Sequence, residues 1–210
     1  MYTHIKNIVP AGIALKQATK AMIMLHGRGG SAEDILSLAS YLDAKDMALF
    51  APEATQHSWY PYGFMSPVPV NQPALDSALA IIDELVESIV AGGIAREHIY
   101  FVGFSQGACL TLEYTSRHAH RYGGVIAFTG GLIGEQLNSS IYKGDFAGTP
   151  VLITTGNADP HVPVSRVQES AAIIEKLGAN LTTKIYKDRP HTVSQQEIVL
   201  ANSLISPKAP

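Results

Sequence analysis

The chain alternates short apolar runs with amphipathic stretches, and this alternation limits the folds open to it. Most of the apolar runs have strand length and a composition typical of burial on both faces; they span 21–25, 47–51, 99–104, 125–128 and 151–155, with a more polar run at 181–186. Apolar residues recur at helical spacing between them, within 35–42, 73–90, 164–177 and from about 194, and a further helical stretch is expected from 107 to about 117. Parallel strands need crossover connections, which these helices supply. The pattern predicts one α/β domain over residues 1–210, with a single, mostly parallel, open sheet and helices on both faces.

Two candidate capping boxes indicate where helices begin. Ser31 lies three residues before Asp34, and Ser194 lies three residues before Glu197. A serine followed at this spacing by an acidic residue can exchange hydrogen bonds with it across the first helical turn. We therefore expect helices to start at about residues 31 and 194.

Composition excludes several classes of protein. The chain has 210 residues, of which 46% are hydrophobic and 16% charged, with a formal net charge of −3 and no basic patch, so we expect no nucleic-acid partner. A single cysteine cannot form an intrachain disulfide and fits a reducing compartment. No run approaches the ~18 apolar residues of a membrane span, and the first residues lack the apolar core of a signal peptide. These features predict a cytoplasmic protein and leave its oligomeric state open, a homodimer included.

The segment 57–73 interrupts the alternation. It carries the large side chains Trp59, Tyr60, Phe64 and Met65 among four prolines, which disfavour a regular helix or strand. Long irregular loops in compact domains commonly serve function. We favour a lid or wall over an apolar pocket, and the alternative is a surface loop held by a few buried rings.

The segment 103–107, Gly-Phe-Ser-Gln-Gly, is the strongest chemical signal. It lies directly after one predicted strand and directly before a predicted helix. A serine on such a turn projects its hydroxyl over the edge of the sheet, and the flanking glycines allow the tight geometry. This context predicts that Ser105 is a nucleophile; the alternative is a glycine-rich turn in which Ser105 caps the helix.

A serine nucleophile needs a base, and His191 is the best placed of eight histidines. It follows the last predicted strand, so it emerges at the same edge of the sheet as Ser105. His161 is an alternative base, although we favour a place for it in the lining of the site. His118 and His120 lie at the far end of the helix that begins after Ser105, roughly 20 Å away.

The base in turn needs a carboxylate to orient it, and Asp159 follows the strand predicted at 151–155. Asp145 does not directly follow a strand, and Asp188 is too close to His191 to face its far ring nitrogen easily. The resulting chain order of serine, aspartate and histidine is the order found in α/β-hydrolases.

An oxyanion hole needs two donors, and a second glycine-rich turn, 26–30, follows the first predicted strand. We expect the backbone N–H groups of Arg28 and Gln106 to be these donors. The turn lacks the known nucleotide-binding glycine patterns, so a phosphate cradle is disfavoured. His26 is interpreted as a structural hydrogen-bonding residue, and Cys109 as a small core residue. No metal-binding pattern is present, so we expect neither a metal nor another cofactor.

Four segments together resemble the phospholipase/carboxylesterase family of α/β-hydrolases. They are Leu-His-Gly-Arg-Gly-Gly at 25–30, Gly-Phe-Ser-Gln-Gly-Ala at 103–108, Gly-x-x-Asp-x-x-Val-Pro at 156–163 and Pro-His at 190–191. The resemblance implies a Ser105–His191–Asp159 triad with Arg28 and Gln106 at the oxyanion hole. It also implies that the segment around Trp59 and the turn ending at Leu132 line an acyl pocket.

One residue departs from the family pattern. Thioesterases of the family usually carry leucine where Arg28 stands, and a cation at the mouth of the site would favour small esters or anionic substrates. We therefore predict a carboxylesterase that cleaves small-molecule, short-chain or aromatic esters. The alternatives are an acyl-protein thioesterase or lysophospholipase, a dienelactone-type hydrolase, which would usually carry cysteine at position 105, and a non-catalytic ligand receptor with a hydrolase fold.

Overall fold

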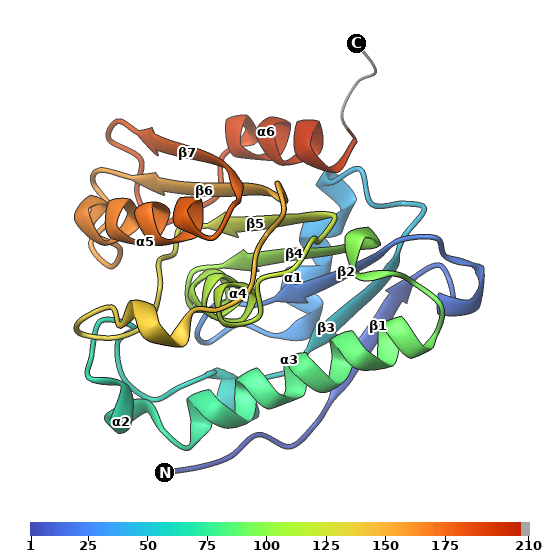
Figure 1. Ribbon diagram of the computed structural model, residues 1–210, viewed down its shortest axis with the longest axis horizontal. Helices are drawn as coiled ribbons and strands as arrows, with labels where there is room; N and C mark the ends of the chain where they lie inside the picture. Colours follow the sequence, from blue (N-terminus) through green and yellow to red (C-terminus); the bar gives the residue numbers. More distant parts are fainter. Residues whose placement is uncertain (207–210) are drawn as a thin grey trace.

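Seven strands form one sheet in the computed structural model, which describes residues 1–206 (Figure 1). The strands are β1 (Ile8–Gly12), β2 (Ala21–Leu25), β3 (Ala48–Pro52), β4 (Ile99–Phe104), β5 (Gly124–Phe128), β6 (Pro150–Gly156) and β7 (Asn180–Tyr186). Their order across the sheet is β1-β3-β2-β4-β5-β6-β7, and only β1 runs antiparallel to its neighbour. The mostly parallel, open sheet predicted from the sequence is confirmed.

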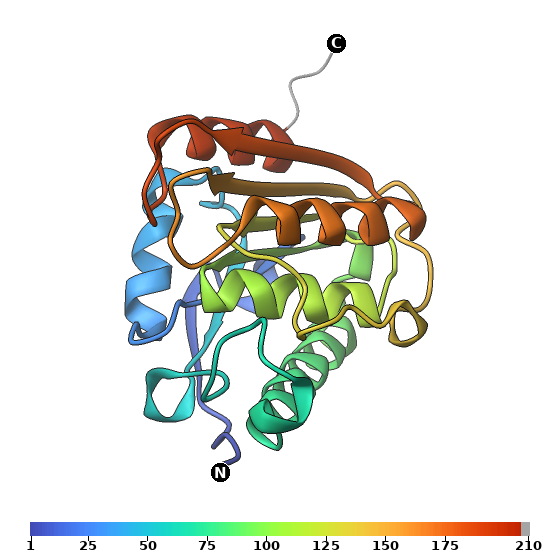
Figure 2. The same ribbon diagram turned by 90° about the vertical axis from the view of Figure 1, so that its left-hand side faces the viewer.

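Helices cover both faces of the sheet, as Figure 2 shows. They are α1 (Ala32–Ser37), α2 (Val68–Asn71), α3 (Ala74–Ala91), α4 (Gln106–Arg117), α5 (Val164–Lys176) and α6 (Gln195–Ile205). Apolar residues of α1 and α6 pack in one hydrophobic cluster, and those of α3, α4 and α5 pack in the other. The predicted capping box is present at Ser31 and Asp34. At α6 the Glu197 carboxylate accepts hydrogen bonds from the backbone N–H and the hydroxyl of Ser194.

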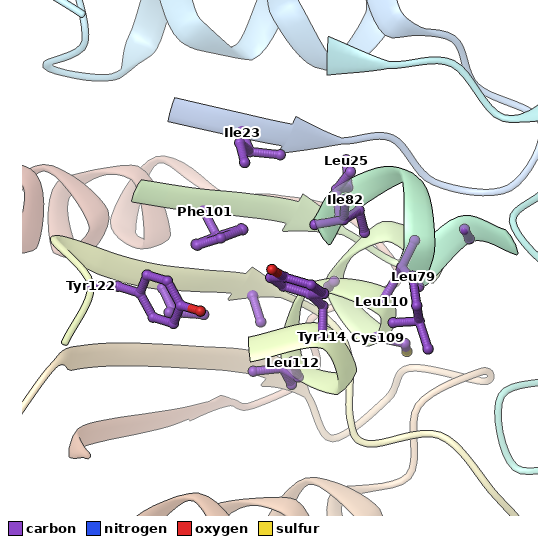
Figure 3. Close-up of a cluster of buried hydrophobic side chains, with 14 of the residues drawn as sticks. Ile23, Leu25, Leu79, Ile82, Phe101, Cys109, Leu110, Leu112, Tyr114 and Tyr122 are labelled. Atoms are coloured by element: carbon purple, nitrogen blue, oxygen red, sulfur yellow. The ribbon is translucent and has the colours of Figure 1, made fainter. Parts of the chain in front are cut away.

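The side chains of each central strand alternate between the two clusters. Met22 and Met24 of β2 point to the α1/α6 side, whereas Ile23 and Leu25 point to the other side. Figure 3 shows the cluster on that other side, in which the Phe101 ring of β4 packs against the rings of Tyr114 on α4 and of Tyr122. Both faces of β2 are therefore buried, which explains its uninterrupted apolar sequence.

The structure differs from the sequence predictions in two elements. Strand β1 was not predicted because it is a half-buried edge strand with a proline inside it, so it has no continuous apolar run. The segment 57–73 is not wholly irregular, since α2 forms one helical turn within it. Pro69 lies in the first turn of α2, where a missing N–H leaves no helical hydrogen bond unmade.

In the part of the chain that the structure describes, no helix has both the length and the apolar character needed to cross a membrane.

Candidate active site

Ser105 lies at the junction of β4 and α4 in a rare backbone conformation. Its φ and ψ are 55° and −118°, outside the regions that residues with a side chain commonly adopt. Two backbone hydrogen bonds hold this turn: the Ser105 N–H donates to the Phe128 carbonyl at 3.0 Å, and the Cys109 N–H donates to the Ser105 carbonyl at 3.0 Å. The hydroxyl is thereby raised above the end of β4, as expected for a nucleophile on a strand-to-helix turn.

The glycines on either side of Ser105 are required by close backbone contacts. A Cβ atom on Gly103 would lie 2.4 Å from the Gly107 carbonyl oxygen. A Cβ atom on Gly107 would lie 2.1 Å from the Leu25 carbonyl oxygen, at the end of β2. Any larger residue would therefore push the start of α4 away from the sheet and displace the serine.

His191 connects Ser105 to Asp159 through two hydrogen bonds. Its Nε2 lies 2.7 Å from the Ser105 Oγ, and its Nδ1 lies 2.8 Å from the Asp159 Oδ2. The three residues follow β4, β6 and β7, whose carboxyl ends lie at one edge of the sheet. The structure thus brings together the three side chains predicted from separate parts of the sequence. Asp159, and not Asp145 or Asp188, is hydrogen-bonded to the histidine.

Asp159 is held in its charged form. Burial raises the pKa of this carboxyl, but hydrogen bonds from the His161 N–H, the His191 ring and the Val162 N–H outweigh it, so the pKa lies below its ordinary value. The two backbone bonds go to Oδ1, at 2.8 and 3.1 Å, which leaves Oδ2 for the imidazole. A carboxylate fixed in this way requires Nδ1 of His191 to carry the proton, so Nε2 is free to accept one.

His161 lies beside the array but does not take the place of His191. Its ring packs edge-on against the His191 ring with a centroid distance of 5.0 Å. Among the described residues, the Ser105 hydroxyl is hydrogen-bonded to His191 and not to His161. The alternative base considered from the sequence is therefore part of the wall of the site.

Two backbone donors lie free near Ser105. Among residues 1–206, the N–H groups of Arg28 and Gln106 have no hydrogen-bond acceptor, although neighbouring groups such as the Gly29 and Gly30 N–H are bonded. The turn that carries Arg28 lies against the serine, because a Cβ atom on Gly27 would be 3.3 Å from the Ser105 Cβ. Free N–H groups of this kind can bind an oxyanion, and Gln106 also lies at the N-terminus of α4.

The Arg28 side chain lines the cavity and is hydrogen-bonded to the loop beside it. Its guanidinium donates hydrogen bonds of 2.6–2.9 Å to the Ser58 hydroxyl and to the carbonyls of residues 60, 61 and 62. These hydrogen bonds hold the guanidinium against the loop without removing its charge, so the expectation that Arg28 favours small or anionic substrates stays a prediction. The same loop, residues 58–62, accepts a 2.8 Å hydrogen bond at the Tyr60 carbonyl from the Gln106 side chain, whose Oε1 accepts one from the Trp59 N–H.

A cavity of about 360 Å³ opens beside Ser105. The predicted pocket residues Tyr60, Phe64 and His161 line it together with Arg28, Gln106 and His191. The other three predicted pocket residues lie outside its lining. Trp59 is buried behind the loop, where its Nε1–H donates to the His26 carbonyl at 2.9 Å; Met65 is 37% exposed; Leu132 is buried, with its N–H bonded to Ser170.

The cavity also contains residues that were not predicted, namely Gly63, Cys109 and Val162. Cys109 lies one helical turn after Ser105, so it shares the face of α4 that carries the serine, and this spacing could have revealed it. Burial raises the pKa of its thiol to about 12, so the sulfur stays protonated and acts as an apolar wall. Within residues 1–206 no cluster of side chains is suited to hold a metal ion.

The mostly parallel sheet carries a serine on the turn after β4, an aspartate after β6 and a histidine after β7. This arrangement defines the class of the α/β-hydrolases. Residues 11–207 match the family model Phospholipase/Carboxylesterase, and the chain belongs to this family. A crystal structure of a phospholipase/carboxylesterase from Dyadobacter fermentans is 60% identical and superposes with a TM-score of 0.96 over 98% of both chains. Acyl-protein thioesterase 1 of Kluyveromyces lactis is 27% identical, covering 91% of this chain and 93% of its own length. The Bacillus cereus carboxylesterase, at 18% identity, shares the fold with a TM-score of 0.77, covering 96% of this chain and 93% of its own.

Proposed function

We propose that this chain hydrolyses carboxylic esters through an acyl-enzyme formed on Ser105. The observation that carries the proposal is the hydrogen-bonded array Ser105–His191–Asp159, with distances of 2.7 and 2.8 Å. His191 takes the proton from the Ser105 hydroxyl as the oxygen attacks the ester carbonyl, and it then protonates the leaving alkoxide. Asp159 orients the imidazole and stabilises its charged form.

The N–H groups of Arg28 and Gln106 bind the oxyanion of each tetrahedral intermediate. Water then attacks the acyl-enzyme, with His191 again acting as the base, and releases the acid and free Ser105. No cofactor enters this sequence, since each proton moves between Ser105, His191, the alcohol and water. The free state of both backbone donors supports this assignment.

The substrates that we propose are small-molecule esters with short or aromatic acyl groups. A cavity of about 360 Å³ lies at the small end of the range for ligand sites, roughly 300–1,000 Å³, and the Tyr60 ring is part of its wall. An acyl-protein thioesterase is the second candidate, favoured by the named relative from Kluyveromyces lactis. Hydrolysis rates for p-nitrophenyl esters from acetate to palmitate, with a palmitoyl thioester alongside, separate the two. A preference that rises to palmitate would contradict the short-chain assignment.

Replacement of the nucleophile tests the reaction itself. Ser105→Ala should lower kcat for p-nitrophenyl acetate by a factor on the order of 10⁶, as for other serine hydrolases, and should abolish labelling by a fluorophosphonate. Ser203→Ala, an exposed position on α6, is the matched control and should behave as the parent. Labelling of Ser105 without turnover of any ester would favour a ligand receptor. A cytoplasmic location and a homodimer stay predictions, tested by cell fractionation and by light scattering.

A further inference from the structure

Next to His191 lies a buried ion pair that the proposed reaction does not use. Arg189 is 7% exposed and Glu197 is fully buried, and the guanidinium Nη2 lies 3.4 Å from the Glu197 Oε1. The Glu197 carboxylate also accepts hydrogen bonds from the Thr154 hydroxyl of β6 and from the N–H and hydroxyl of Ser194. It is therefore anchored both to the sheet and to the start of α6.

The guanidinium binds the backbone on both sides of His191. Its Nη1 donates to the Pro190 carbonyl at 2.8 Å and to the Thr192 carbonyl, while its Nη2 donates to the Thr129 hydroxyl at 2.8 Å, just beyond β5. Within the described chain, residues 189–193 make no backbone–backbone hydrogen bond of their own. The side chain of Arg189 thus supplies the polar contacts that hold this turn.

Stability alone accounts poorly for this arrangement. A buried ion pair contributes little net stability, because removing two charges from water offsets most of their attraction. In addition, the buried Nε of Arg189 has no hydrogen-bond partner among the described residues, and such groups are uncommon in folded proteins. Two of its satisfied contacts go to the carbonyls on either side of His191, and the others, to Thr129 and Glu197, anchor the guanidinium to the sheet and to α6.

We propose that Arg189, anchored by Glu197, is a positioning residue for His191. Arg189 fixes the carbonyls of residues 190 and 192. It thereby fixes the backbone of His191, whose imidazole extends between Asp159 and Ser105. The inference rests on the proposed function, since it concerns the base of that reaction. A displacement of about 1 Å in a catalytic group can lower a rate about 100-fold.

The test is the purified Arg189→Lys variant assayed with p-nitrophenyl acetate. A lysine keeps the charge but cannot bind both carbonyls, Thr129 and Glu197 at once, so we expect kcat to fall about 100-fold with KM unchanged within about twofold. We also expect weakening of the low-field proton resonance of the His191–Asp159 hydrogen bond, identified by its absence in His191→Gln. A purely structural role would alter neither kcat of the folded fraction nor this resonance.

Arg166→Lys is the matched control. Arg166 is 4% exposed and likewise donates to backbone carbonyls, those of Leu132, Gly134 and Glu135, in a turn that does not carry the array. It should lose stability to urea while keeping kcat and the resonance. An equal fall of kcat in both variants, or no fall in Arg189→Lys, would overturn the proposal.

A second variant, Glu197→Gln, tests the proposal if Arg189→Lys does not fold. Glu197→Gln keeps the size of the side chain and one carbonyl oxygen but removes the charge that anchors Arg189. We expect a smaller fall in kcat, about 10-fold, again with KM unchanged; an unchanged kcat and resonance would count against the proposal. Activity that persists in Ser105→Ala would instead refute the proposed function, so the two failures are distinguishable.

Discussion

Ser105 adopts its rare conformation because its neighbours leave no other. Its N–H is bonded to the carbonyl of Phe128 on the next strand, and Gly107 allows α4 to begin against the end of β2. Backbone strain of this kind persists only where the surrounding structure holds it, and it is concentrated at functional sites. The strain at Ser105 is consistent with the role that we propose for its hydroxyl.

Asp159→Asn tests the orientation of the base. The amide oxygen of asparagine can still accept the two backbone hydrogen bonds of Asp159, but its NH₂ group then faces Nδ1 of His191. The imidazole must place its proton on Nε2, towards Ser105, and can no longer act as a base. We expect kcat for p-nitrophenyl acetate to fall by about 10⁴-fold, as in serine proteases, with little change in KM.

Asp188→Asn is the control for Asp159→Asn. It makes the same chemical change three residues before His191, at a position with φ of 53° that asparagine adopts readily. Its kcat should equal that of the parent. A comparable loss in both variants would mean that charge near the histidine, and not its tautomer, limits the reaction.

Ser105, Asp159 and His191 could be predicted because each follows a strand, and parallel strands end at one edge. The pocket residues could not be predicted in the same way. Trp59 and Tyr60 are neighbours in an irregular segment, and which of them faces the cavity depends on hydrogen bonds with residues far away in the sequence, His26 and Gln106. Composition revealed that this segment carries aromatic residues but not which way they point.

At the scale of elements, the loop 58–62 is shaped by the same two residues that offer free N–H groups. Arg28 binds it through four hydrogen bonds, and the Gln106 side chain bonds to the backbone of Trp59 and Tyr60. A movement of the loop 58–62, which forms part of the cavity wall, would therefore also move Arg28 and Gln106 and their free N–H groups. A substrate that displaces the loop would disturb the donors as well.

Arg28→Leu measures this coupling. Leucine keeps the backbone N–H but removes all four side-chain hydrogen bonds, each of which is worth about 1 kcal/mol net or less at an exposed rim. We expect faster amide hydrogen exchange in residues 58–62, a several-fold rise in KM for p-nitrophenyl acetate and a weaker preference for short chains. Arg121→Leu, which loses only one 3.3 Å hydrogen bond to Ala147, should change none of these. Unchanged exchange in Arg28→Leu would mean that the other contacts of the loop, those of Gln106 and His4 among them, hold it without Arg28.

Elements with a buried apolar face were predictable, and elements without one were not. Strands β2, β4, β5 and β6 match continuous apolar runs because both of their faces are covered. The run at 47–51 corresponds to β3, which begins one residue later. The short β1 has no continuous apolar run and no fully buried face. Its pairing with β3, and not its own sequence, makes it a strand.

Across the whole molecule, the half-buried His4 and the buried His26 tie the N-terminal segment and β2 to the chain after β3. His4 accepts a 3.0 Å hydrogen bond from the Thr55 N–H and donates one of 2.9 Å to the Trp59 carbonyl. His26 accepts a 3.0 Å hydrogen bond from the Ala54 N–H and donates one of 2.8 Å to the Gly27 carbonyl. Each ring needs one bare nitrogen, so each pattern requires the neutral form.

These contacts predict that the fold loses stability in mild acid. Burial lowers the pKa of His4 and of His26, more than the carbonyls of Trp59 and Gly27 and the carboxylates of Glu53 and Asp34 raise it. Above about pH 6.5, the pKa of histidine in an unfolded chain, both rings are neutral in the folded and the unfolded state, so neither makes stability depend on pH. As the pH falls through that value, the unfolded chain binds protons that the folded chain does not, so the free energy of unfolding decreases.

Urea unfolding at pH 7.5 and 5.5 measures the effect, and His4→Gln isolates one part of it. Glutamine offers a neutral acceptor and donor in place of the ring and does not titrate, so the decrease in unfolding free energy between the two pH values should be smaller, by no more than about 1.4 kcal/mol, the linkage limit for one histidine over one pH unit below its unfolded pKa of about 6.5. The exposed His98→Gln should leave the decrease unchanged, since that ring holds no buried backbone group.

The protonation of Asp159 does not contribute to the change in stability between pH 7.5 and 5.5. Its pKa is lowered, so its stabilisation is present above about pH 3.9 and is lost only as the pH falls through the lower folded value. An equal decrease in the parent and in His4→Gln would show that the N-terminal segment separates from the loop without protonation of His4.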